Sequence, residues 1–126
     1  MAAMMAGAVR WGPVASAPQV RTAVTLVYVG ADDCAPCRAW QLTERKQFQA
    51  SAEFVQLNYR EVKSSTLRDV LDDECWPEDP RSYRDRLGRA GVPLWLVISG
   101  EEVVERGFGA SQWHTAVLPR VKSLLR

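Results

Sequence analysis

Two cysteines three positions apart, Cys34 and Cys37, are the residues of this sequence whose types and spacing best suit chemistry. They follow an apolar run rich in β-branched residues, 25–29, which ends in a polar break at 30–33. The residues from 34 to about 50 include few β-branched types and predict a helix. A strand, a short loop and a helix that opens on C-x-x-C form the arrangement expected of a redox dithiol.

The start of a helix is a place where such a dithiol can react. The first helical turn has unpaired N–H groups and a partial positive charge, which stabilise a thiolate and lower its pKa. Cys34 lies at or just before the helix start and is the predicted attacking sulfur, and Cys37 lies one turn later, within reach of a disulfide. Pro36 suits this turn because its missing N–H is no loss there.

Charged residues beside Cys34 act in opposite directions on its reactivity. Arg38 adds a positive charge, whereas Asp32 and Asp33 add negative charges that would raise the pKa of the thiol. The sequence alone leaves the balance between them open.

Two other interpretations of the cysteine pair need to be weighed. C-x-x-C also forms half of a zinc site, but a structural zinc site needs four ligands. Only Cys75 and His114 remain, and they would have to converge from distant segments. The second alternative is an inert, buried pair. The strand before the pair and the helix after it favour redox chemistry, so we expect no metal and no cofactor besides the disulfide itself.

The composition is that of an ordinary globular protein. A chain of 126 residues is long enough for one domain with its own core, and we expect an irregular leader over 1–21 and a single domain over 22–126. A formal net charge of +1 gives no electrostatic argument for nucleic acid or acidic membranes as partners. Three cysteines do not make a structural disulfide framework.

The leader bears on the compartment. Residues 1–9 are small and apolar, and the Ala-Ser-Ala at 15–17 resembles a cleavage site, but Arg10 follows the apolar stretch instead of preceding it. This is a poor secretory signal. We therefore expect a cytoplasmic protein, with the periplasm as the alternative if the leader is a poor or wrongly started signal.

The first half of the domain is expected to form two parallel strands joined by the redox helix. The first strand, 23–29, is apolar on both faces and should be central. The helix over 34–50 should bury Trp40 and Phe48 and expose its polar distal half, 41–49. A second strand is expected over 53–60, parallel to the first through a right-handed crossover.

An extra helical segment is expected around 64–90. Thr66 and Asp69 resemble a capping box for a helix over 64–75. The apolar residues of this stretch share one helical face, which argues that its cysteine belongs to the core. A short second helix should follow over 80–88. The residues on the shared face are Leu67, Val70, Leu71 and Cys75.

The last third of the chain predicts a hairpin and a final helix. Pro93 precedes a buried strand over 94–98, and an antiparallel edge strand should return over 103–107. We expect Ser111 to cap the final helix and Pro119 to kink or interrupt it. Its inner face is expected to carry Trp113, Val117, Val121, Leu124 and Leu125, with His114 beside it as a partly exposed surface residue.

The predicted order is therefore β-α-β-α-β-β-α, an α/β fold with a mixed sheet of about four strands and helices on both sides. Two short motifs serve as anchors for a resemblance: the sequence resembles the thioredoxin-like superfamily over about 22–126, as a divergent bacterial member. One anchor is the Cys-Ala-Pro-Cys motif at 34–37, and the other is Gly91-Val92-Pro93 before the strand. The resemblance implies that the Val92–Pro93 bond is cis and faces Cys34.

Three positions depart from the pattern of typical thioredoxins. Asp33 replaces the tryptophan before the first cysteine, and Ala35 replaces the glycine after it. Tyr28 stands where the family has a buried aspartate that assists proton transfer at the second cysteine. At this position the sequence therefore lacks the carboxylate that the family uses for proton transfer.

The resemblance implies a thiol–disulfide oxidoreductase that acts on protein substrates, with an unidentified electron donor or acceptor. Cys34 would attack the substrate and Cys37 would resolve the mixed disulfide, while the backbone of Val92 and the ring of Pro93 would contact the substrate. The alternative is a non-catalytic binding or redox-sensing module of the same fold. The direction of electron flow stays open. The residues expected to support the site are Asp33, Pro36, Arg38 and Trp40.

Overall fold

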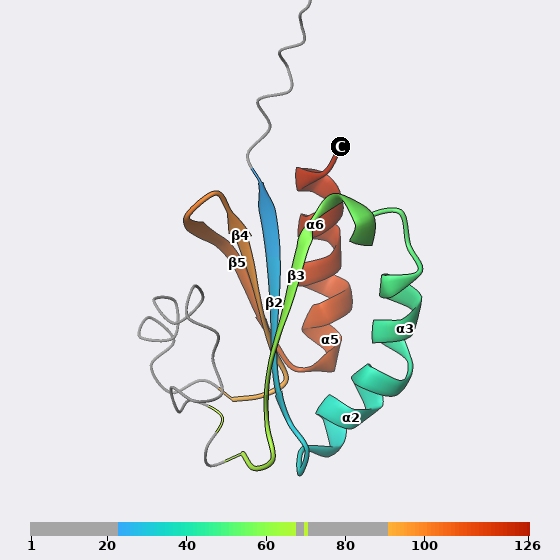
Figure 1. Cartoon of the computed structure of the whole chain (residues 1–126), viewed down its shortest axis with the longest axis vertical. Helices are drawn as coiled ribbons and strands as arrows, with labels where there is room; N and C mark the ends of the chain where they lie inside the picture. Colours follow the sequence, from blue (N-terminus) through green and yellow to red (C-terminus); the bar gives the residue numbers. More distant parts are fainter. Residues whose placement is uncertain (1–22, 68–69, 71–90) are drawn as a thin grey trace, which may run out of the picture.

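The computed structural model describes residues 23–67, 70 and 91–126 (Figure 1). The leader and the expected helix over 80–88 lie outside the described residues. So do most of the expected helix over 64–75 and its Cys75.

A four-stranded mixed sheet organises the fold, in the order β3-β2-β4-β5. β2 lies in the interior of the sheet, as its apolar sequence predicts, and pairs parallel to β3 and antiparallel to β4. β5 returns antiparallel to β4 as an edge strand, which confirms the predicted hairpin. The strands are β2 (Val24–Ala31), β3 (Asn58–Ser64), β4 (Leu94–Ser99) and β5 (Glu102–Phe108).

The helices of the described residues cover one face of this sheet (Figure 1). Their aromatic and aliphatic side chains pack against the strand residues of that face, among them Leu26, Tyr28, Trp95 and Val97. The opposite face is aliphatic and is also buried. The helical elements are α2 (Ala35–Leu42), α3 (Glu44–Gln49), η2 (Phe54–Gln56), α5 (Ala110–Gln112), the π-helical turn η4 (Trp113–Val117) and α6 (Leu118–Leu124).

The predicted helix over 34–50 is in fact two helices, and the prediction of a continuous one is wrong. The break falls at Thr43, whose φ of −120° is not helical. The Thr43 hydroxyl donates to the Ala39 carbonyl at 2.8 Å, and the Thr43 N–H donates to the same carbonyl at 3.2 Å. Such a bond from a threonine side chain to the carbonyl four residues earlier often bends a helix. Trp40 and Phe48 are buried as predicted, but Gln41, expected to be exposed, is buried too.

The second strand begins later than predicted. Residues 53–57 contain the 3₁₀ turn η2, and β3 starts only at Asn58. Phe54 turns inward to meet Phe48 edge to face, with ring centroids 5.7 Å apart, while Val55 is 81% exposed. At the far end of β3, Leu67 is 49% exposed, so its predicted place on an inner face is wrong, whereas Val70 is buried as expected.

The final helix begins at a glycine and not at Ser111, which lies inside α5. Gly109 is the N-cap, with a φ of +88° that favours glycine. The π-helical turn η4 then precedes Pro119, which has no N–H to continue the α-helical ladder. The predicted interruption is therefore present. The inner face is as predicted, with Trp113, Val117 and Val121 buried and Leu124 and Leu125 partly buried.

Candidate redox site

The two cysteines meet where β2 ends and α2 begins. Cys34 is the N-cap of α2, in an extended conformation, and its sulfur is joined to that of Cys37 in a disulfide with a Cα–Cα distance of 5.2 Å. The backbone N–H of Cys37 lies 3.1 Å from the Cys34 sulfur. A thiolate at Cys34 would therefore meet a hydrogen-bond donor and the positive end of the helix, both of which favour the charged form.

The two sulfurs differ in access. Cys34 is 5% exposed, whereas Cys37 is fully buried. Only Cys34 thus presents an edge to a large reaction partner. This asymmetry agrees with the order of attack inferred from the helix start.

The segment before β4 lies against the disulfide. The Val92–Pro93 bond is cis, and the Val92 carbonyl oxygen is 3.9 Å from the Cys34 sulfur. Pro93 is buried, and its carbonyl accepts a hydrogen bond from the Gly109 N–H at 2.9 Å. Val92 also packs on the small cluster that contains both cysteines. The structure therefore brings together the two segments that the sequence singled out.

The aspartates before Cys34 have partners of their own. Asp32 faces Lys63 with an N–O distance of 3.7 Å, and the Asp33 carboxylate accepts a hydrogen bond from the Leu67 N–H at 2.8 Å. These contacts offset part of the negative charge beside the sulfur. Pro36 and Arg38 are exposed on the first turns of α2, as their places in the sequence suggest.

Beneath the disulfide the structure places a neutral polar pair. The Tyr28 hydroxyl donates to the Cys37 carbonyl at 3.4 Å and accepts a hydrogen bond from Gln41 Nε2 at 2.8 Å. Tyr28 is fully buried, and burial raises its pKa to about 12. The hydroxyl therefore stays protonated at neutral pH and does not replace a carboxylate as a proton acceptor.

Tyr28 belongs to an aromatic cluster that supports the site from the helix-covered face. Its ring centroid is 4.4 Å from that of Trp40 and 5.9 Å from that of Trp95. Trp40 also meets Trp113 edge to face at 5.2 Å. Trp40, which the sequence predicts to support the site, packs α2 on the sheet through these ring contacts.

A charged cluster beside Tyr28 was not found from the sequence. Glu61 is the register partner of Tyr28 on β3, and its carboxylate accepts from Arg45 Nη1 and from the Tyr59 hydroxyl, each at 2.6 Å. Burial and the hydrogen bond to Glu61 raise the pKa of Tyr59 far above its usual range. Tyr59 and Glu61 are two residues apart on a strand and therefore point to the same face, which was the signal for this cluster that the sequence offered. This cluster joins α3 to β3.

The remaining candidate ligands stay apart from the dithiol. His114 is exposed, as expected, and lies 3.3 Å from a Glu44 oxygen. Among the residues that the structure describes, no three His, Cys, Asp or Glu side chains are grouped so that they could hold a metal. Within the same residues, no helix has the length and apolarity needed to cross a membrane.

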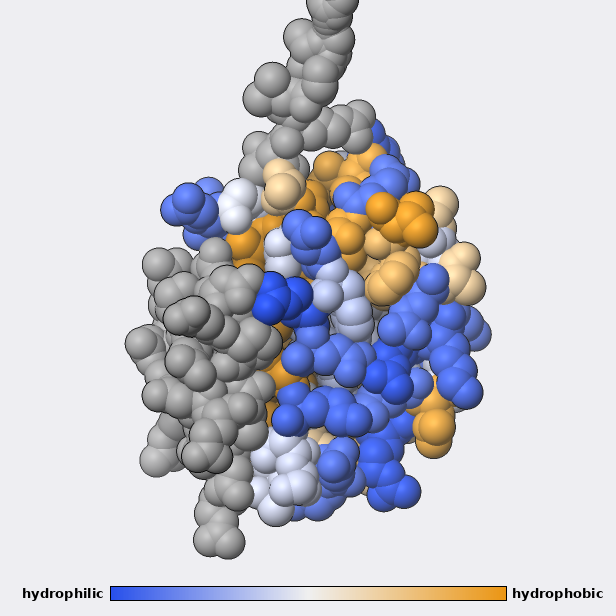
Figure 2. All heavy atoms as spheres, viewed as in Figure 1, coloured by the Kyte–Doolittle hydropathy of each residue, from blue (hydrophilic) through white to orange (hydrophobic). Residues whose placement is uncertain are grey.

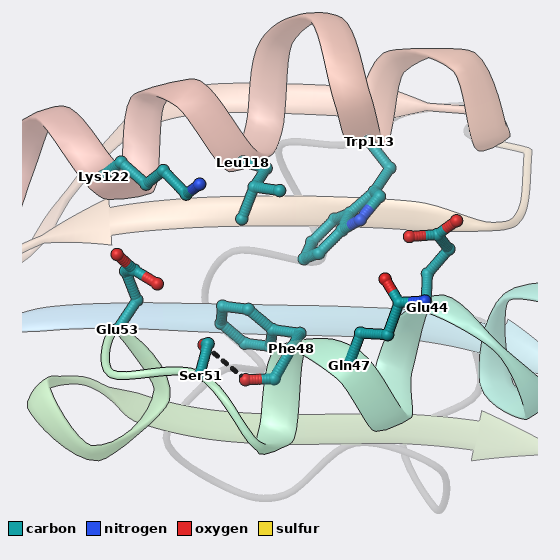
Figure 3. Close-up of a pocket in the computed structure, with 8 residues that line it drawn as sticks. All are labelled: Glu44, Gln47, Phe48, Ser51, Glu53, Trp113, Leu118 and Lys122. Atoms are coloured by element: carbon teal, nitrogen blue, oxygen red, sulfur yellow. Dashed lines mark hydrogen bonds between the residues drawn. The ribbon is translucent and has the colours of Figure 1, made fainter.

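A separate hollow lies between α3 and the C-terminal helix (Figure 3). Phe48 and Trp113 form its apolar floor, and charged side chains such as Glu44 and Lys122 stand at its rim. It contains none of the residues of the dithiol site. Figure 2 shows a largely hydrophilic surface over α2 and α3, with hydrophobic surface gathered near the end of α6, opposite the dithiol.

Comparison with solved structures supports the fold. No protein-family model and no curated protein sequence matches the chain. Among solved structures, it is similar to thioredoxin f from spinach chloroplast, at 14% identity and a TM-score of 0.56 over 86% of this chain and 84% of the other. A thioredoxin from Malassezia sympodialis has 14% identity and a TM-score of 0.55 over 82% and 83%, and thioredoxin f2 from Chlamydomonas reinhardtii has 14% and 0.54 over 86% of each. The chain therefore has a thioredoxin-like fold.

Proposed function

We propose that this chain of thioredoxin-like fold is a thiol–disulfide oxidoreductase that acts on protein substrates through Cys34 and Cys37. One observation carries the proposal. The disulfide caps the N-terminus of α2 with only the Cys34 edge exposed, and the Val92 carbonyl lies 3.9 Å from that sulfur. The site thus combines a helix start that stabilises the Cys34 thiolate, a buried Cys37 sulfur that can resolve a mixed disulfide, and a neighbouring backbone segment that can contact the substrate.

The reaction that this geometry supports has two exchange steps. In the reduced protein, the Cys34 thiolate attacks one sulfur of a substrate disulfide, whose other sulfur leaves as a thiolate and takes up a proton. The Cys37 thiolate then attacks Cys34, which breaks the mixed disulfide and releases the second substrate thiol. Two electrons pass from the protein to the substrate, and an external dithiol must restore the reduced pair. The same steps in reverse oxidise a substrate dithiol.

The chain's own residues have separate tasks in these steps. The Cys37 N–H, whose nitrogen is 3.1 Å from the Cys34 sulfur, stabilises negative charge on that sulfur, and so does the positive end of the helix. Val92 would offer backbone hydrogen bonds to an extended substrate, and Pro93 would shape the apolar surface beside the sulfurs. Because Tyr28 stays protonated, the proton of the Cys37 thiol would pass to the departing substrate thiolate or to water. We expect no cofactor beyond the cysteine pair.

Trapping the mixed disulfide tests the proposal. In Cys37→Ser the first step can occur and the second cannot, so incubation of the reduced variant with a disulfide-containing peptide should give a one-to-one adduct by mass spectrometry. Cys34→Ser is the matched control, with Cys75 replaced by serine in both variants. It should give no adduct, and its rate of peptide reduction should not exceed that of dithiothreitol alone. Equal peptide reduction by wild type and Cys34→Ser would refute the assignment.

A redox-sensing module without turnover is the second candidate. The neutral Tyr28–Gln41 pair beneath the disulfide favours it, because none of the residues that the structure describes offers a buried carboxylate to accept the Cys37 proton. Such a module would form and lose the disulfide reversibly but would reduce peptides no faster than Cys34→Ser. Measurement of turnover therefore separates the two candidates.

A further inference from the structure

The surroundings of Cys37 disfavour the form of this residue that reacts. Cys37 is fully buried, and the small cluster around it contains Ala31, Cys34 and Val92 but no charged residue. A thiolate in such a place loses the water that would stabilise its charge. The second exchange step nevertheless needs a thiolate at Cys37. A hydrogen-bond donor beside Cys37 would offset this loss.

The hydroxyl of Tyr28 is such a donor. Of the described side chains, it alone donates a hydrogen bond to Cys37, at 3.4 Å from the carbonyl oxygen. Gln41 Nε2 donates to the same hydroxyl oxygen at 2.8 Å, so the proton of the hydroxyl is left to point toward Cys37. An O–H···O hydrogen bond is usually about 2.7–2.8 Å long, so the bond to the carbonyl is weak and its proton is available to a better acceptor.

Gly30 leaves the space that this hydroxyl occupies. The side chain of Tyr28 extends along β2 over Gly30, where a Cβ atom would collide with the phenol oxygen and with the ring carbon that bears it. Gly30 is not among the glycines with positive φ, so its backbone does not require glycine and the missing side chain is what matters. Gly30 and Gln41 together fix the hydroxyl beside Cys37.

We propose that, in the reduced protein, the Tyr28 hydroxyl donates a hydrogen bond to the Cys37 sulfur and stabilises the thiolate that resolves the mixed disulfide. The inference rests on the proposed function. Reduction frees the Cys37 sulfur from Cys34, and a thiolate is a stronger acceptor than the neutral carbonyl of the same residue. Gln41 and Gly30 are positioning residues, because they act through the hydroxyl.

The hydroxyl shares its proton in this step and does not transfer it. The electron pair of the Cys37 thiolate forms the bond to the Cys34 sulfur, while the bond between Cys34 and the substrate breaks and the substrate leaves as a thiolate. Tyr28 stays protonated throughout, because burial raises its pKa to about 12. The charged groups that act on this hydroxyl from neighbouring elements are Glu61 of β3, Arg45 of α3 and Asp32 after β2.

Separate measurement of the two exchange steps tests this role. All proteins carry Cys75→Ser, so that only the dithiol reacts. The first step is followed in the Cys37→Ser background, as the rate of adduct formation with a peptide that carries an activated disulfide. For the second step, the adduct of the intact dithiol with the same peptide is formed at low pH, where Cys37 is protonated. A jump to higher pH then starts the resolution, and mass spectrometry after acid quenching gives its rate.

Tyr28→Phe should slow the second step about threefold at neutral pH and leave the first step unchanged. Without the hydrogen bond, the pH midpoint of the second step should rise by about one unit, which lowers the thiolate fraction about tenfold. The more basic thiolate is about threefold more nucleophilic, so part of the rate is recovered. Between about pH 6 and about pH 10 the variant should therefore change from slower than wild type to equal or faster.

Two further variants control for packing. Tyr59→Phe also removes a phenol hydroxyl, but this hydroxyl donates to Glu61 and not to Cys37, so neither step should change. Gly30→Ala keeps the phenol of Tyr28 but displaces its hydroxyl, and it should raise the midpoint of the second step as Tyr28→Phe does. An unchanged midpoint in Tyr28→Phe, or an equal slowing of both steps at every pH, would overturn the proposal. If Tyr28→Phe does not fold, Gly30→Ala decides by the same two criteria.

A titration without substrate separates this proposal from the proposed function. If the reduced Cys37→Ser protein forms no adduct with the peptide, the oxidoreductase assignment fails. The hydrogen bond is then tested in the variant that carries both Cys34→Ser and Cys75→Ser, in which Cys37 is the only cysteine left. The carbon-13 shift of the Cys37 Cβ reports the titration of its thiol. Addition of Tyr28→Phe should raise this midpoint by about one unit. An unchanged midpoint would contradict a hydrogen bond to the sulfur.

Discussion

The hydrogen bond between Tyr28 and Gln41 gives a sharp test of how the site is supported. Tyr28→Phe removes only the hydroxyl and leaves the ring packed on Trp40. The Gln41 amide, which donates to that hydroxyl at 2.8 Å and is 7% exposed, would then be buried without its partner. A buried donor left unsatisfied costs about 1–3 kcal/mol, so we expect a loss of about 2 kcal/mol in the free energy of unfolding.

Substitution of Gln41, the partner of Tyr28, should lower the free energy of unfolding by less than Tyr28→Phe does. In Gln41→Leu, Tyr28 loses one bond but can still donate to the Cys37 carbonyl, so a loss of about 1 kcal/mol is expected. In the double variant no donor is stranded. Its loss should therefore be smaller than the sum of the single losses by about 1 kcal/mol.

Urea unfolding of the oxidised proteins, followed by tryptophan fluorescence and by far-ultraviolet circular dichroism, measures all four free energies. The slope with urea should be the same in each variant, which shows that the comparison concerns stability alone. Losses that add to within about 0.3 kcal/mol would refute the reasoning, because the hydroxyl and the amide would then contribute independently.

Three further predictions concern the surroundings of the site. The pKa of Tyr28 is about 12 in the folded protein and 10.0 in the unfolded chain, so the unfolded chain loses this proton first as the pH rises. The free energy of unfolding should therefore fall between pH 10 and pH 12. Urea unfolding across that range should show a less steep fall for Tyr28→Phe than for wild type. Gly107→Ala should destabilise the protein by about 1–3 kcal/mol, since the new methyl group would collide with Val117; Gly107→Ala combined with Val117→Ala should recover part of this loss in thermal unfolding. Glu61→Gln removes the charge that faces Arg45 in the partly exposed cluster. We expect the free energy of unfolding, measured with urea, to fall by about 1 kcal/mol, and this loss should be smaller at high salt.

The dithiol and the sheet around it could be predicted from the sequence because their signals are local and strong. The Cys34–Cys37 spacing, the apolar strand before it and Gly91–Pro93 before the next strand each depend on neighbouring residues. The structure brings these segments together, with the Val92 carbonyl 3.9 Å from the Cys34 sulfur. The hairpin of β4 and β5 followed from the same kind of pattern.

The predictions that failed depend on contacts between distant segments or on small local competitions. Gln41 is polar and was expected to face water, but its amide meets Tyr28 of the neighbouring strand, which no periodicity reveals. The break at Thr43 lies where its hydroxyl bonds back to the Ala39 carbonyl, an option that a helical pattern does not exclude. Residues 53–57 alternate like a strand, yet the packing of Phe54 on Phe48 turns them into η2.

A redox titration of the Cys34–Cys37 pair tests the central claim most directly. The protein would be equilibrated in graded dithiol buffers, and its free thiols trapped and counted by mass spectrometry, with Cys34→Ser as the control. The account predicts one reversible two-electron transition that Cys34→Ser lacks; a midpoint near about −270 mV would indicate a reductant and one near about −120 mV an oxidant. A pair that shows no reversible transition in any buffer would contradict the account.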